Sequence, residues 1–234
     1  LEAVLANFDA GRPAGTGVEG EVVLALPAGS GPPLAGVLRP HAGGEAPLLV
    51  FVAGTPTYDG LLNRPAAPAT RDPGWSAREF SAFATVPPMH LAFLESPGGG
   101  RDFAGALLAA LPLLGELVAT GGRKPLLVCE REAAAVVALR IAAIRPLVSG
   151  LVFTGGGAMT AKSLQDLGDL PVRVAATKGP AEASLQSMFT WVANQQGKLA
   201  VDLQWLSDAR PAWQLGLPAF GREIAAFAGE LFRR

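Results

Sequence analysis

The most informative stretch of the sequence is Pro47-Leu48-Leu49-Val50-Phe51-Val52-Ala53, an uninterrupted apolar run that ends at Gly54. A short run of this kind, rich in branched and aromatic side chains, is typical of a strand buried on both faces. Such strands occur in parallel sheets that helices cover on both sides. This stretch therefore predicts a central strand of an α/β domain.

Further strands and helices are predicted on both sides of this run. Short apolar runs predict seven more strands, at residues 18–26, 34–38, 89–94, 126–129, 151–154, 172–176 and 199–206. Helical patterns fall between or after them, at residues 75–84, 103–119, 132–144, 181–196 and 219–232. Alternating strands and helices predict right-handed crossovers onto a mostly parallel sheet. The first two strands have no helix between them, so we expect them to form an antiparallel hairpin at one edge.

The length and composition are consistent with this architecture and exclude several classes of protein. Of the 234 residues, 50% are apolar and 17% charged, which argues against a disordered chain. A net charge of −1 leaves no excess of cations for nucleic-acid binding. The single cysteine excludes an internal disulfide framework, and two histidines leave little material for a metal site. We expect a connector at residues 1–17 and a single domain over 18–234.

The sequence gives less information about the origin and location of the protein. No apolar run reaches the roughly 20 residues that span a bilayer, and the longest candidate contains Pro112. Arginine outnumbers lysine and alanine is abundant, which favours a bacterial source with a GC-rich genome. The first residue is Leu1 with no signal-peptide pattern after it, so we expect a processed form or an excised domain. The compartment and the oligomeric state are not predicted.

Three stretches resemble a known fold. The segment from Leu48 to Pro56 looks like a third strand that runs into an oxyanion loop, and Glu95-Ser96-Pro97-Gly98-Gly99-Gly100 looks like a Gly-rich turn after strand four. Residues 125–156 look like a nucleophile strand, its helix and the next strand. The chain is thus similar to the α/β-hydrolase fold of serine esterases, lipases and dienelactone hydrolases. The resemblance implies a doubly wound, mostly parallel eight-stranded sheet with helices on both faces and no large lid.

The same resemblance implies that the catalytic triad is degenerate. The family carries its nucleophile in a Gly-x-Ser-x-Gly turn between strand and helix. Here helix length places Glu132 at the nucleophile position, and a shift of one residue places Arg131 there. Gly179 is nearest the expected acid, and Arg210 lies about where the histidine is expected. Arginine does not deprotonate in proteins, so it cannot act as the base.

Each reactive candidate has a structural interpretation beside the catalytic one. Glu132 resembles the carboxylate nucleophile of some family members. Without a histidine to activate water, a covalent ester formed at Glu132 would not be hydrolysed. The favoured interpretation is therefore a carboxylate stabilised near a helix N-terminus. Cys129 resembles a thiolate nucleophile, but a buried structural cysteine is favoured. His90 lies inside an apolar run and predicts a hydrogen-bonded core histidine. His41 is predicted to lie in a surface turn.

The positions at the ends of the predicted strands also suggest a binding pocket. In this architecture ligands bind at the carboxyl ends of the strands. Thr55 follows the third strand and offers a backbone N–H to an oxyanion, although a plain turn is the simpler interpretation. Four charged residues follow the predicted strand ends: Arg131, Glu132, Lys178 and Arg210. If their side chains converge, they form an ion-pair network or a small-anion site.

The sequence therefore favours a catalytically inactive α/β-hydrolase-like domain with a structural, partner-binding or ligand-binding role. We expect no cofactor and no metal, and a partner, if any, that is another domain or protein chain. The alternative is an active carboxylic-ester hydrolase that uses a non-standard site, with candidate nucleophiles Ser96, Ser149 and Ser207. A third possibility is a small-anion or small-molecule binding protein.

Overall fold

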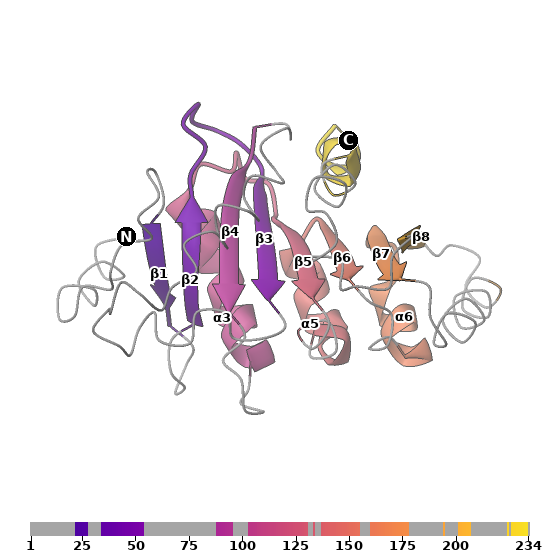
Figure 1. Cartoon of the computed structure of the whole chain (residues 1–234). Helices are drawn as coiled ribbons and strands as arrows, with labels where there is room; N and C mark the ends of the chain where they lie inside the picture. The colour runs from indigo at the N-terminus through magenta and orange to yellow at the C-terminus, as the bar shows by residue number, and fades with distance from the viewer. Residues whose placement is uncertain are drawn as a thin grey trace.

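The structure is a computed structural model, which describes residues 22–27, 34–53, 88–95, 103–130, 133, 137–154, 160–177, 194, 201–206, 224 and 226–233. The described strands form one sheet of eight strands in the order β1-β2-β4-β3-β5-β6-β7-β8 (Figure 1). Their bounds are β1 (Val22–Leu26), β2 (Leu34–Arg39), β3 (Leu48–Ala53), β4 (His90–Glu95), β5 (Leu126–Glu130), β6 (Gly150–Thr154), β7 (Val172–Thr177) and β8 (Val201–Leu206).

The directions of the strands confirm the predicted mixed sheet. β2 pairs antiparallel with both β1 and β4, so β1 and β2 form the expected hairpin at one edge of the sheet. Every other pair, from β4–β3 to β7–β8, is parallel. All eight strands were predicted within a few residues of their observed ends. The predicted connector at residues 1–17 and the absence of a large lid fall outside the described residues and stay predictions.

Two helices follow the sequence pattern closely. α3 (Phe103–Leu117) buries a stripe of residues at intervals of three and four, among them Phe103, Leu107, Leu111 and Leu114. Pro112 lies inside this helix and is exposed, so the missing N–H and the bulk of its ring are on the solvent side. The C-terminal helix is described at residue 224 and over 226–231, inside the predicted range of 219–232.

The predicted helix over residues 132–144 is not continuous. At Arg140 φ is −122° and ψ is 19°, which leaves the helical region, and a new short helix, α5 (Ile141–Ile144), begins after it. The N–H of Arg140 bonds to the carbonyl of Val137, three residues back, which tightens and ends the preceding turn. A 3₁₀ turn, η1 (Arg145–Leu147), then leads into β6.

One described helix was not predicted. α6 (Ala161–Leu167) has only seven residues, so its apolar periodicity is too brief to stand out. Its start is set by Thr160, whose side chain accepts from the N–H of Ser163 while the Ser163 hydroxyl accepts from the N–H of Thr160. Of the other predicted helices, residues 75–84 lie outside the described part, as does 181–196 except Asn194.

The sheet is covered by helices on both faces, as predicted. Along β3, Leu48, Val50 and Val52 belong to the cluster that contains the buried residues of α3, α5 and α6. The alternate residues Leu49 and Phe51 face the other way and belong to a second cluster. That second cluster includes the buried residues of the C-terminal helix, Ile224, Phe227 and Ala228. Figure 1 shows this helix beside the amino-terminal ends of β5 and β6.

Two glycines provide a matched test of the packing. A Cβ at Gly36 in β2 would overlap the backbone carbonyl of Phe93 in β4, which cannot move without breaking the strand pairing. We expect Gly36→Ala to lower the free energy of unfolding by about 1–3 kcal/mol in denaturant titrations.

The control is Gly115→Ala in α3, where a Cβ meets no atom within 4 Å. Alanine favours the helix over glycine, so this variant should gain about 0.5–1 kcal/mol. Equal effects at the two positions would contradict the described contact between β2 and β4.

Candidate functional site

The candidate site lies where the parallel strands end. β3, β5, β7 and β8 run in the same direction, so their carboxyl ends meet at one edge of the sheet. The predicted pocket residues follow these ends in the sequence: Thr55 after β3, Arg131 and Glu132 after β5, Lys178 and Gly179 after β7, and Arg210 after β8. All six lie outside the described residues, so the prediction that they converge remains untested.

The connection that follows β5, where the resemblance predicts the nucleophile position, has a buried small residue on each side. Cys129 is the fourth residue of β5 and pairs with Val52 on one side and Phe153 on the other. Ala133 is helical, and both Cys129 and Ala133 are fully buried in the same core cluster. β5 ends at Glu130 and Ala133 is helical, so Arg131 and Glu132, the two candidates for the nucleophile position, are the two residues between them in the sequence.

Cys129 is a buried core residue, as predicted. Its side chain has no exposed surface, and this burial raises the pKa of the thiol well above its usual range. The thiolate is the nucleophilic form of cysteine, so a thiol held neutral in the core is unreactive. The catalytic interpretation of Cys129 is thereby removed.

His90 is a hydrogen-bonded core histidine, also as predicted. It is the first residue of β4 and only 2% exposed. Its Nδ1 accepts a hydrogen bond from the backbone N–H of His41 at 2.9 Å. Its Nε2 donates to the backbone carbonyl of Ala119 at 3.1 Å. Both ring nitrogens therefore have partners within the protein.

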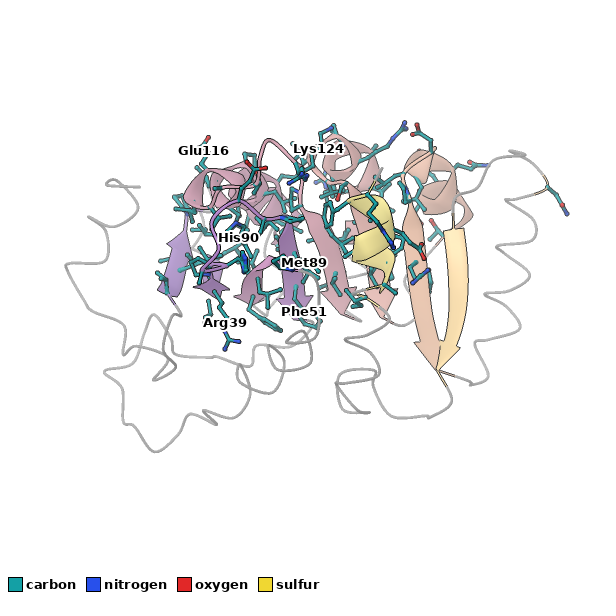
Figure 2. All side chains as sticks on the ribbon, turned by 90° about the horizontal axis from the view of Figure 1, so that it is seen from above. Arg39, Phe51, Met89, His90, Glu116 and Lys124 are labelled. Atoms are coloured by element: carbon teal, nitrogen blue, oxygen red, sulfur yellow. The ribbon has the colours of Figure 1, made fainter. Side chains whose placement is uncertain are left out.

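The two histidines lie at the edge of the sheet opposite the candidate site. His41 is in the connection from β2 to β3, and its ring centroid is 6.5 Å from that of His90. β3 and β4 start side by side at this edge, with Leu48 opposite His90. Figure 2 shows His90 and Met89 at the ends of the central strands. At a rise of ~3.3 Å per residue, His90 is about 17 Å from the carboxyl end of β4.

Ser149, one of the alternative nucleophiles, also lies at the amino-terminal edge. It immediately precedes β6, and its hydroxyl donates to the carbonyl of Pro125, just before β5. Its N–H bonds to the same carbonyl, so the residue joins the starts of two neighbouring strands. Ser96 and Ser207 lie outside the described residues.

The burial of one charged residue, Arg173, was not predicted from the sequence. Arg173 lies in β7, within a run predicted as an apolar strand, and is 7% exposed. Its guanidinium carbon is 4.7 Å from the centroid of the Phe227 ring, and its Nη2 is 4.0 Å from a carboxylate oxygen of Glu230. These contacts join β7 to the C-terminal helix. The only sequence signal was an arginine within a strand, which does not identify its partners.

Within the described part of the chain, no three His, Cys, Asp or Glu side chains are grouped so that they could hold a metal ion. Among the same residues, every helix is too short or too polar to span a lipid bilayer.

Solved structures similar to this one include esterases and a dienelactone hydrolase. Est1E from Butyrivibrio proteoclasticus aligns over 91% of this chain and 99% of its own, with a TM-score of 0.63 and 10% identity. A dienelactone hydrolase from Anabaena variabilis aligns over 91% and 96%, with a TM-score of 0.59 and 14% identity. Brefeldin A esterase aligns over 99% and 85%, with a TM-score of 0.61 and 12% identity.

No protein-family model and no curated protein matches the chain. At identities this low the structural likeness shows the fold alone. The chain therefore has the α/β-hydrolase fold, as its strands and helices predicted.

The burial of Cys129 gives a direct chemical test. We expect iodoacetamide to leave the native protein unmodified at neutral pH, because the thiol is both inaccessible and neutral. The denatured protein should gain the mass of one carbamidomethyl group. Intact mass spectrometry assigns this group to Cys129, because Cys129 is the single cysteine. Rapid labelling of the native protein would show that the end of β5 is open to solvent.

Proposed function

We propose that this protein is a catalytically inactive α/β-hydrolase-like domain, whose role is structural or lies in binding a partner or ligand. The observation that carries the proposal is the location of its two histidines. A serine or cysteine hydrolase of this fold needs an imidazole base at the carboxyl ends of the strands. Here His41 and His90 are at the opposite edge, and His90 is buried with both ring nitrogens bonded to the backbone.

The sequence at the end of β5 supports the same proposal. It reads Glu130-Arg131-Glu132, with neither a serine nor a cysteine. The family pattern has a small residue two positions before and two positions after the nucleophile. Position 131 has Cys129 and Ala133 at those places, and both are fully buried. This favours Arg131 over Glu132 as the residue at the nucleophile position, and a guanidinium there cannot attack an ester.

A small-anion pocket is one form of binding that the sequence suggests. Three cationic residues, Arg131, Lys178 and Arg210, follow the ends of β5, β7 and β8. Thr55 follows β3, where a backbone N–H can donate to an oxyanion. Glu132 would then balance part of the positive charge. We infer that a carboxylate or phosphate group is the chemistry such a pocket accepts.

The competing proposal is a carboxylic-ester hydrolase with a non-standard site. It draws on the names of the structural neighbours, which are esterases and a dienelactone hydrolase. Such a hydrolase would lack a histidine base, because the chain has no third histidine and the two present lie at the amino-terminal edge of the sheet.

Catalysis is tested with a fluorophosphonate probe, read by intact mass, beside hydrolysis of p-nitrophenyl acetate. We expect no adduct and no hydrolysis above that of the heat-denatured protein, because no activated serine is available. A known serine esterase, run in parallel, controls for the reagents. A stoichiometric adduct with turnover would overturn the proposal, and peptide mapping would name the serine.

Anion binding is tested by thermal denaturation with inorganic phosphate. Because a ligand that binds the folded state raises Tm with concentration, we expect a concentration-dependent rise in the wild type. Arg131→Gln, Lys178→Gln and Arg210→Gln should each reduce it. The matched control is Lys124→Gln, which removes an exposed cation just before β5, at the other edge. An equal rise in all four variants would show that the stabilisation does not come from the pocket.

A further inference from the structure

The ring of His90 connects three segments that are far apart in the sequence. One bond joins it to the backbone of His41, 49 residues away, and the other to the backbone of Ala119, 29 residues away. His41 is in the connection from β2 to β3, and Ala119 follows α3. The backbone N–H of His90 bonds in addition to the carbonyl of Pro47. The ring therefore links these segments to one another through hydrogen bonds at the amino-terminal edge of the sheet.

Both bonds require the neutral ring. A backbone N–H can only donate, so Nδ1 must offer a lone pair to His41; a carbonyl can only accept, so Nε2 must carry the proton toward Ala119. This is a single neutral tautomer. A second proton on Nδ1 would place two donors against each other and put a charge on a side chain that is 2% exposed.

Within the described part of the chain, few groups could balance such a charge. The titratable or charged residues on the neighbouring described segments are Arg39, His41, Glu45, Glu116, Arg123 and Lys124. Of these, His41 has its ring at 70° to that of His90, and Glu45 is paired with Arg123 at 3.4 Å on the surface. Figure 2 shows Arg39 and Glu116 on opposite sides of the sheet, with their charged ends directed away from His90. Among the described residues, both partners of the His90 ring nitrogens are backbone groups.

We propose that His90 is an acid-sensitive latch. While the ring is neutral, it holds the 40–45 segment against β4. When acid adds the second proton, the bond from His41 is lost and that segment loosens. The hydrogen bond from the N–H of Ala46 to the carbonyl of Ala119 does not involve the ring and should remain. The loosening of residues 40–45 should therefore not extend into β3. This device is independent of whether the domain catalyses a reaction.

Ring nitrogen NMR tests the latch directly. The chain has only two histidines, so the spectrum contains two ring systems, and His41→Ala assigns them. We expect His90 to show an unprotonated Nδ1 and a protonated Nε2 at about pH 7.5. When acid adds the second proton to the ring, the backbone N–H signal of His41 should shift together with the ring signals, because that N–H loses its acceptor. A His90 ring that carries its proton on Nδ1, or is doubly protonated before acid is added, would overturn the proposal.

Thermal denaturation before and after acidification supplies an independent readout. A doubly protonated ring cannot accept the bond from His41, so the wild-type Tm should fall further on acidification than that of His90→Gln, which has no ring to protonate. His41→Ala keeps the backbone N–H donor and is the matched control, which should fall as much as the wild type. A parallel fall in all three proteins would contradict the latch.

Discussion

The burial of β3 and β5 on both faces is the constraint on which the structure depends. Side chains of β3 alternate between two apolar clusters, one beneath α3, α5 and α6 and the other beneath the C-terminal helix. Water cannot reach the backbone of such strands, so their polar groups must pair with neighbouring strands. β3 lies between β4 and β5 and pairs with both. The parallel core, its helical crossovers and the common edge for the strand ends all follow from this requirement.

The sequence was most informative where local patterns and burial agree. The uninterrupted apolar run at residues 47–53 is typical of a strand in a doubly covered sheet, and β3 was predicted from it. α6 was missed because seven residues give too little periodicity, and its start depends on a reciprocal pair between Thr160 and Ser163. The break at Arg140 interrupts a helical pattern whose apolar residues continue on both sides. Backbone angles at a single residue leave no trace in that pattern.

The candidate site, too, was only partly predictable from the sequence. The positions of Arg131, Lys178 and Arg210 after the strand ends follow from topology and could be read from the sequence. Whether their side chains meet depends on tertiary contacts that no periodic pattern encodes. The partners of His90 illustrate the difficulty: its burial was predicted from the apolar run around it, but its bonds to the backbones of His41 and Ala119 join residues 49 and 29 positions away.

The place of the C-terminal helix has a consequence for synthesis of the protein. Proteins emerge from the ribosome amino end first, and residues 224–231 come after all eight described strands. Until they emerge, one face of the central strands lacks the cover of Ile224, Phe227 and Ala228. A nascent or truncated chain that ends before Ile224 therefore presents apolar surface from Leu126, Val128 and Val152 to chaperones or to other chains.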